Sequence, residues 1–306
     1  MKIYEYPLSS KISGERVIAL GFFDGVHIGH RQILKRACEL SRSLGIPSAV
    51  FTFPSEAALP KSSGERLYDT KEKISLISEC GIDEIIIADF DFVKAKTPED
   101  FIIDILIGEL GCRTALSGRD FRFGKNAEGN TSLLEKILLE NGRGFIAEDD
   151  VKINSEKAST TQIKEYLADG KINLANEMLG SPYYTKAEVH HGRGVGNSLG
   201  FPTINTDIGG RVAFLRAGVY KTDVEIDGIS YPALTNVGSC PTFGSFPAHA
   251  ESFIFDYSGD LYGKEVKIFF ISYIREEKKF ASPKELTEQI TRDIEFCRRK
   301  QNTKEK

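Results

Sequence analysis

The sequence predicts an α/β domain with a Rossmann-like parallel sheet, followed by a small antiparallel β-barrel and a C-terminal helix. Two observations carry this prediction. In the first half of the chain, a helix, a glycine and an apolar strand follow one another four times, which is typical of a parallel sheet with crossover helices. After about residue 182, short strands separated by turns replace this pattern. A length of 306 residues also favours two domains.

The first strand is expected at residues 17–23, where an apolar run ends in glycine-rich sequence. Apolar side chains at helical spacing predict a helix over 30–44, and Gly45 can end it before a second strand at 46–53. The pattern then predicts three further pairs of helix and strand, at 70–80 and 82–90, 98–110 and 112–118, and 131–141 and 143–149.

In the second half, residues 218–227 and 229–236 are expected to pair as strands around a turn at Gly228. Residues 251–257 and 266–274 are expected to form a second pair of strands.

A helix should begin near Ser282, where Pro283 and Glu285 complete a capping pattern. Gly180 and Pro182 are expected to end the last helix of the first domain. The predicted domains are therefore residues 1–181 and 182–306.

Composition argues against several classes of protein. The net charge of −4 argues against a broad nucleic-acid surface. We find no apolar run long enough to span a bilayer and no secretory signal at the start, so a cytoplasmic protein without a membrane partner is expected. The cysteines are odd in number and never form a C-x-x-C pair, which favours free thiols in a reducing compartment; they are Cys38, Cys80, Cys112, Cys240 and Cys297.

The segment GFFDGVHIGH, residues 21–30, lies where the first predicted strand meets the first helix. Ligands bind at this edge of an open α/β sheet, and a helix N-terminus offers N–H groups to phosphate. Gly21, Gly25 and Gly29 let the backbone approach a ligand, and His27 and His30 are spaced to point at one phosphate group. Two donating imidazoles would stabilise the charge that builds up when a phosphate attacks the α-phosphorus of ATP. Helix capping or metal binding by the histidines is the alternative interpretation.

A second glycine-rich segment, GRGVGNSLGFPTIN, spans residues 192–205. Its alternating glycines, Gly192, Gly194 and Gly196, can expose successive backbone N–H groups to a phosphate chain. Thr203 and Asn205 are two residues apart, so on a strand both side chains face the same way. Their hydroxyl and amide oxygens suit Mg²⁺ bridging ATP phosphates.

These motifs resemble those of the prokaryotic bifunctional riboflavin kinase/FAD synthetase family, and the resemblance covers nearly the whole chain. FDGVHIGH is similar to its N-terminal signature and LGFPTIN to its kinase signature. Further similar segments are LYDTKEKISLI (67–77), SGRDFRFGK (117–125) and STTQIK (159–164). The chain departs from the common pattern at Gln162 and Lys164, where arginine is frequent, and it lacks a Pro-His-Pro after the second strand.

The resemblance implies two activities that use ATP: phosphorylation of riboflavin to FMN by the C-terminal domain and adenylylation of FMN to FAD by the N-terminal domain. It implies that Glu251 accepts the proton of the ribityl hydroxyl group, that His27 and His30 act in adenylylation, and that Thr203 and Asn205 hold Mg²⁺ and ATP beside the glycine loop. The residues implied to bind ATP for adenylylation are Gly21, Phe22, Asp24, Gly29, Asp120, Ser159, Thr160, Thr161 and Lys164.

Two other hypotheses stay open at this point. Only one activity could be retained, with the departures near Lys164 favouring loss of adenylylation. Alternatively, the chain could sense flavin or nucleotide without turnover. The sequence leaves the oligomeric state undetermined.

Overall fold

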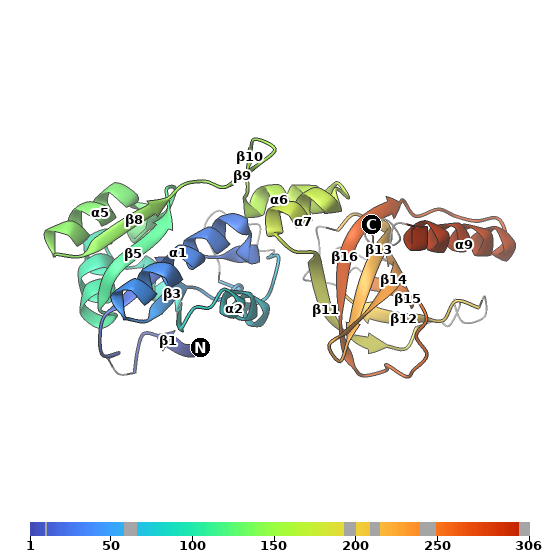
Figure 1. Ribbon diagram of the computed structural model, residues 1–306, viewed down its shortest axis with the longest axis horizontal. Coiled ribbons are helices and arrows are strands. Elements are labelled where there is room, and N and C mark those ends of the chain that lie inside the picture. Colours follow the sequence, from blue (N-terminus) through green and yellow to red (C-terminus); the bar gives the residue numbers. More distant parts are fainter. Residues whose placement is uncertain (10, 58–65, 193–199, 209–214, 239–248, 300–306) are drawn as a thin grey trace. The chain divides into compact units, whose positions relative to one another are not determined.

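The computed structural model describes the chain except for residues 10, 58–65, 193–199, 209–214, 239–248 and 300–306 (Figure 1). The chain divides into two compact units, Met1–Thr160 and Thr161–Lys306. The predicted boundary after residue 181 remains a prediction about which residues serve which activity.

The first unit contains a six-stranded sheet in which every neighbouring pair is parallel, as the sequence predicts. Its strands are β1 (Lys2–Tyr6), β2 (Arg16–Leu20), β3 (Ser48–Thr52), β4 (Glu84–Ala88), β5 (Cys112–Gly118) and β8 (Gly144–Glu148). They lie in the order β1-β4-β3-β2-β5-β8. From β2 the chain first builds the sheet toward one edge and later continues from β5 toward the other. The order therefore reverses between β2 and β5, where a ligand crevice is expected.

The helices of this unit connect the parallel strands, and the longer ones match the predicted positions. They are α1 (Ile28–Leu44), α2 (Thr70–Glu79), α3 (Phe90–Lys94), α4 (Pro98–Asp100), the π-helix η2 (Phe101–Glu109) and α5 (Thr131–Glu140). Two short 3₁₀ turns, η1 (Asp24–Val26) and η3 (Lys125–Ala127), and two small hairpins complete the unit; the hairpins are β6 (Arg122–Phe123) with β7 (Gly129–Asn130) and β9 (Lys152–Ile153) with β10 (Glu156–Lys157).

The central strands are buried on both faces because helices cover both sides of the sheet. Ile18 and Leu20 of β2 belong to a core cluster with Phe101 of η2 and Leu134 of α5. Helix α1 packs against β2, β3 and β5 and buries Leu34 and other apolar side chains. This packing fixes the direction in which the chain runs from the end of β2 into α1.

The second unit contains a closed six-stranded barrel, which confirms the predicted class of fold. Its strands are β11 (Tyr183–His190), β12 (Thr203–Asp207), β13 (Gly218–Ile226), β14 (Ile229–Gly238), β15 (His249–Ile254) and β16 (Glu265–Arg275), and each pair is antiparallel. Helices α6 (Thr160–Ala168) and α7 (Ile172–Leu179) precede the barrel, and α9 (Pro283–Arg299) follows it (Figure 1).

One predicted pair of strands is wrong. Residues 218–227 and 229–236 do pair, as β13 and β14, but β15 does not pair with β16. Instead β15 lies between β12 and β14, and β16 lies between β11 and β13. The connection from Phe255 to Lys264 is too long for a tight hairpin, and barrel closure gives each strand two other partners.

Alternate residues of the barrel strands face different surroundings. Ala250, Ser252 and Ile254 of β15 are buried, whereas Glu251 and Phe253 between them are partly exposed. Inside the barrel the hydroxyl groups of three residues form a hydrogen-bonded chain, 2.6 Å from Thr222 to Thr235 and 2.8 Å from Thr235 to Ser252. The outer face of β15 is therefore available for a ligand.

Candidate active sites

The turn from β2 into α1 holds a backbone conformation that ordinary residues rarely adopt. Phe23 has a φ of 55° and Val26 a φ of 42°, and Gly25 between them has a φ of 79°. Such angles persist at functional sites where surrounding contacts enforce them. Here the buried carboxylate of Asp24 accepts a hydrogen bond from the Leu67 N–H group at 3.1 Å. The carbonyl group of Asp24 accepts another from the Thr160 hydroxyl group at 3.0 Å.

His27 and His30 stand together at the start of α1. Their rings stack with centroids 3.6 Å apart, and His27 Nδ1 accepts a hydrogen bond from the His30 backbone N–H group at 3.4 Å. Nδ1 of a neutral His27 is thus an acceptor, which leaves the proton on Nε2 as a donor. His30 Nδ1 is buried and has no hydrogen-bond partner within the described part of the chain. That orphan atom is a feature of a site completed by a ligand.

Burial keeps both imidazoles neutral. Burial is the main cause, the nearby Lys157 ammonium group adds to it and Asp120 opposes it, and together they lower the pKa of His27 to about 4. Burial also lowers the pKa of His30 well below its usual value, assisted by the neighbouring His27 imidazole and the Lys73 ammonium group. The pair can therefore donate N–H hydrogen bonds to an anion near neutral pH without carrying positive charge.

A cavity of about 270 Å³ opens beside these histidines, at the carboxyl ends of β2, β5 and β8. The predicted residues that line it are Gly21, Phe22, His27, Gly29, His30, Asp120, Ser159 and Thr160. Asp24 instead lies buried in the turn, where it holds Leu67 and Thr160. Thr161 and Lys164 lie on α6, in the second unit. The structure thus brings together most of the predicted adenylylation residues within the first unit.

Sequence reasoning missed Lys157, which is the cation of this cavity. Its ammonium group lies 2.8 Å from Asp120 Oδ2 and 2.8 Å from Asp150 Oδ1. The hydrogen bond from Lys157 lowers the pKa of Asp120. The only signal in the sequence is that Lys157 precedes the STTQIK segment by two residues, which is too little to distinguish it from a surface lysine.

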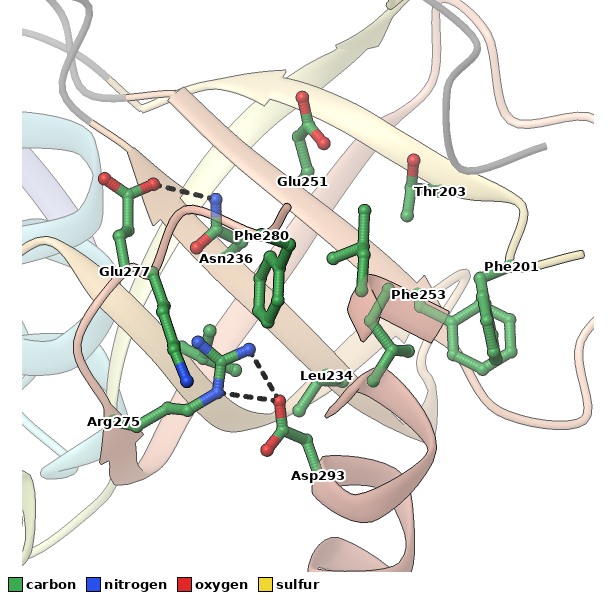
Figure 2. A pocket seen from close by; sticks show the side chains of 14 residues that line it. Phe201, Thr203, Leu234, Asn236, Glu251, Phe253, Arg275, Glu277, Phe280 and Asp293 are labelled. Atoms are coloured by element: carbon green, nitrogen blue, oxygen red, sulfur yellow. Dashed lines mark hydrogen bonds and ion pairs between the residues drawn. The ribbon is translucent and has the colours of Figure 1, made fainter. Parts of the chain in front are cut away.

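The second site lies on the outer face of three neighbouring barrel strands. Asn205 of β12 is opposite Glu251 of β15, which is opposite Asn236 of β14. One step along the same face, Thr203 is opposite Phe253. Thr203 and Asn205 therefore share a face, as their spacing predicts, and the Glu251 carboxylate lies beside them. Figure 2 shows Glu251 and Thr203 on adjacent strands at one side of the pocket.

A pocket of about 320 Å³ lies between this face, the segment after β16 and helix α9. Its apolar wall is formed by Phe201, Val219, Leu234, Phe253, Phe280, Leu286 and Ile290. Asp293 of α9 is buried, and its carboxylate accepts hydrogen bonds from Arg275 at 2.8 and 2.9 Å (Figure 2). At the other side, the Asn236 amide donates to Glu277 at 3.1 Å. The pocket can hold a flat apolar group beside the Glu251 carboxylate.

The glycine loop of this site is described only at its start. Gly192 faces Asn205 so closely that any Cβ atom there would overlap the Asn205 side chain. Gly194 and Gly196 lie outside the described residues. The oxygen atoms of Thr203 and Asn205 are hard donors on one strand face, and this donor set fits Mg²⁺. Clusters of three or more His, Cys, Asp or Glu side chains suited to a metal are absent from the part of the chain that the structure describes.

Two family models match the chain, in the order that the sequence predicts. The FAD synthetase model matches residues 9–162, and the riboflavin kinase model matches residues 179–301. Curated relatives extend the match across nearly the whole chain. The bifunctional riboflavin kinase/FMN adenylyltransferase of Escherichia coli K12 is 34% identical over 284 residues, covering 90% of each chain. The chain belongs to this family.

Other members of the bifunctional riboflavin kinase/FMN adenylyltransferase family are similarly distant. The Bacillus subtilis protein is 32% identical over 298 residues, which is 95% of this chain and 94% of its own length. Among solved structures, one described as a macrolide-efflux protein from Streptococcus pneumoniae has a TM-score of 0.86 and 28% identity, covering 97% of this chain and 99% of that one. In the helices described here, no stretch has both the length and the apolar character to cross a bilayer.

Proposed function

We propose that this protein makes FAD from riboflavin in two steps that each consume ATP. In the first, residues 182–306 phosphorylate riboflavin to FMN. In the second, residues 1–181 transfer an adenylyl group to FMN and release pyrophosphate. Family membership supports both activities, and the two separate cavities supply a site for each.

Adenylyl transfer would use the cavity beside His27 and His30. The phosphate group of FMN attacks the α-phosphorus of ATP, and negative charge grows on the oxygen atoms of that phosphorus. Neutral imidazoles donate N–H hydrogen bonds to those oxygen atoms, and the free N–H groups at the start of α1 add to the stabilisation. We infer that Gly21 and Gly29 let the protein backbone approach the nucleotide, while Asp120, Ser159 and Thr160 hold the nucleotide. Thr161 and Lys164 are proposed to bind ATP on the strength of the family motif.

Phosphorylation would use the barrel pocket. The apolar wall suits the flavin ring system, which leaves the ribityl chain to reach toward Glu251. The Glu251 carboxylate then accepts the proton of the terminal hydroxyl group as its oxygen attacks the γ-phosphorus of ATP. Thr203 and Asn205 would hold Mg²⁺, which neutralises phosphate charge when bound. Gly192, with Gly194 and Gly196, is proposed to cradle the phosphates.

The observation that carries this proposal is the presence of both cavities, each lined by its own family motif, in one chain. The test is incubation of the purified protein with riboflavin, Mg²⁺ and ATP, followed by chromatographic separation of flavins. FMN and then FAD should appear, with ADP and pyrophosphate in matching amounts. In a second reaction FMN replaces riboflavin, which reports adenylyl transfer alone. Failure to form FMN would refute the kinase assignment, and failure to form FAD from FMN would refute the adenylyltransferase assignment.

The proposed reactions also name the partners of the chain. ATP, riboflavin and FMN are its small-molecule partners, and Mg²⁺ is the proposed metal. A cytoplasmic location remains our proposal, since the substrates ATP and FMN are made inside cells and the cysteines described here, Cys38, Cys80, Cys112 and Cys297, are free thiols. Cys240 lies outside the described residues.

A further inference from the structure

Lys73 is a buried lysine that the proposed reactions do not use. It lies on α2 and is only 1% exposed, although lysine is rarely buried without partners. Its ammonium group donates hydrogen bonds to two backbone carbonyl groups, that of Phe22 at 3.2 Å and that of Phe53 at 2.5 Å. These carbonyl groups follow β2 and β3, respectively. Lys73 thus joins α2 to the ends of two neighbouring strands, beside the switch point of the sheet.

The Phe22 carbonyl group lies inside the turn that leads to the histidines. It also accepts a hydrogen bond from the Thr52 hydroxyl group at 2.9 Å. The ammonium group of Lys73 lies 4.3 Å from the centre of the Phe22 ring as well, which is within range of a cation–π contact. Two donors on one carbonyl group, together with a contact to the ring, restrict how Phe22 can turn. The next residue, Phe23, has the left-handed backbone that the turn requires.

The segment that precedes α2 also contacts this turn, at Asp24, two residues after Phe22. The N–H group of Leu67 binds the Asp24 carboxylate, so α2 and its leading segment fix the turn at both Phe22 and Asp24. His27 follows directly after this turn and caps α1. A shift of Phe22 would therefore move the start of α1 relative to a bound nucleotide.

We infer that Lys73 is a positioning residue for adenylyl transfer, because its ammonium group anchors the Phe22 carbonyl group and so holds His27 and His30 in place for the nucleotide. This inference rests on the proposed adenylyl transfer. A purely structural lysine would contribute to the stability of the first unit without setting the rate of the chemical step. The two roles differ in what happens to kcat in a protein that stays folded.

The pH dependence of kcat gives a second readout, because charged groups around Lys73 affect its ionisation. Burial, opposed by Asp24 and Glu56 and assisted by Arg66, brings the pKa of Lys73 down to about 8. His30 also lies close enough for the ammonium charge to lower its pKa. Lys73 should therefore lose its charge as the pH rises through about 8. The anchor then weakens, and kcat for FAD formation should fall over the same range.

The decisive experiment compares Lys73→Met with Lys71→Met in the full chain. Lys71 lies on the same helix and is exposed, so its variant removes the same charge without touching the turn. With FMN and ATP as substrates, Lys73→Met should lower kcat for FAD formation by about 10–100-fold, the scale on which small misplacements affect catalysis. KM values should change less than kcat. Lys71→Met should stay within about twofold of the parent, and the fall in kcat near pH 8 should disappear only in Lys73→Met.

The outcomes separate the inference from the proposed function. A parent protein that makes no FAD from FMN would refute adenylyl transfer itself. An active parent whose Lys73→Met variant keeps kcat within about twofold, or keeps the fall near pH 8, would refute the role of Lys73 alone. If circular dichroism shows that Lys73→Met does not fold, Thr52→Val tests the same anchor, because it removes the other donor to Phe22 with little change of shape. Unchanged kcat in folded Thr52→Val would overturn the inference, and a severalfold fall would support it.

Discussion

Glu251 and His30 lie in different units, so substitution of each should affect one activity only. Glu251→Ala is expected to lower kcat for FMN formation by about 10²–10⁴-fold, the range for loss of a general base. FAD formation from FMN should be unchanged, because Glu251 lies on the barrel. His30→Ala is expected to lower kcat for FAD formation from FMN and to leave FMN formation unchanged. Both rates are measured by chromatography of the flavins.

The matched control for Glu251 is Glu188→Ala, since Glu188 is an exposed carboxylate on another barrel strand. It should leave both rates within about twofold of the parent, as expected of a surface position. Equal loss of both activities in a folded Glu251→Ala protein would contradict the division into two sites.

The depressed pKa of His27 makes a prediction about stability and pH. The folded protein keeps His27 neutral down to about pH 4, whereas the unfolded chain binds a proton below about 6.5. The unfolded state therefore binds more protons between these values, so stability is complete above 6.5 and falls as the pH drops toward 4. Between pH 7 and 5 the first unit should lose about 1–2 kcal/mol through this residue, as measured by urea unfolding. His27→Gln should show a smaller loss over the same interval. An equal loss in the variant would mean that other groups cause the acid sensitivity.

At the level of elements, the four glycines that end the predicted helices all adopt positive φ, but they differ in their surroundings. The φ values are 67°, 82°, 61° and 68° at Gly45, Gly81, Gly111 and Gly142. This confirms the pattern from which the parallel sheet was predicted. Local sequence was sufficient there, because a glycine can end a helix in the left-handed conformation without support from distant segments.

Gly111 and Gly142 offer a test of what close contact adds to backbone strain. A Cβ atom at Gly111 would collide with the Gly14 carbonyl oxygen, whereas nothing lies within 4 Å of one at Gly142. Gly142→Ala should cost about 1 kcal/mol, the strain of a left-handed alanine alone. Gly111→Ala should cost more than about 2 kcal/mol, because strain and collision add. If chemical unfolding shows similar losses of unfolding free energy in the two variants, the backbone near Gly14 must move to make room for the new methyl group.

The ion pair between Arg275 and Asp293 joins α9 to the barrel and borders the pocket that is proposed to bind flavin. The Asp293 side chain is only 4% exposed, so its removal leaves Arg275 with a poorly compensated charge. Asp293→Ala should destabilise the second unit by about 2–4 kcal/mol and raise KM for riboflavin. Arg298→Ala is the control, since its pair with Asp256 is exposed and should contribute less than about 1 kcal/mol. Thermal unfolding and riboflavin titration measure both effects, and equal effects in the two variants would contradict this prediction.

Some elements could not be predicted because their reasons lie far away in the sequence. Strand β1 pairs with β4, some eighty residues later, and its mostly exposed side chains carry no clear pattern. The wrong pairing of residues 251–257 with 266–274 has a similar cause, because barrel closure decides which strands are neighbours. The same holds for the candidate site residues. Sequence motifs pointed to His27 and Glu251, whereas Lys73 and Lys157 are distinguished only by their contacts with segments far away in the sequence.

For the whole molecule, the extent of the second unit suggests which fragment will fold. Asn176 of α7 donates to the Phe270 carbonyl group at 2.8 Å and accepts from the Tyr183 N–H group at 2.8 Å. Leu167 of α6 accepts a backbone hydrogen bond from Arg216 at 3.3 Å. A fragment of residues 182–306 contains the proposed kinase site but would leave these groups without partners.

We therefore expect residues 161–306 to form a more stable fragment than 182–306. The longer fragment should unfold cooperatively and phosphorylate riboflavin. The shorter one should melt at least about 5 °C lower, since about 1 kcal/mol shifts the midpoint of a small domain by several degrees. Differential scanning calorimetry compares them directly. Equal midpoints would show that α6 and α7 add nothing to the barrel.

The alternation of buried and exposed residues on β15 separates two structural roles within six residues. Ala250, Ser252 and Ile254 pack in the interior, while Glu251 and Phe253 line the pocket that is proposed to bind flavin. Interior positions should therefore tolerate substitutions that keep volume and hydroxyl pairing without changing the shape of the proposed flavin pocket. Conversely, substitutions at the outer positions can reshape the proposed flavin pocket while the barrel keeps its own stability.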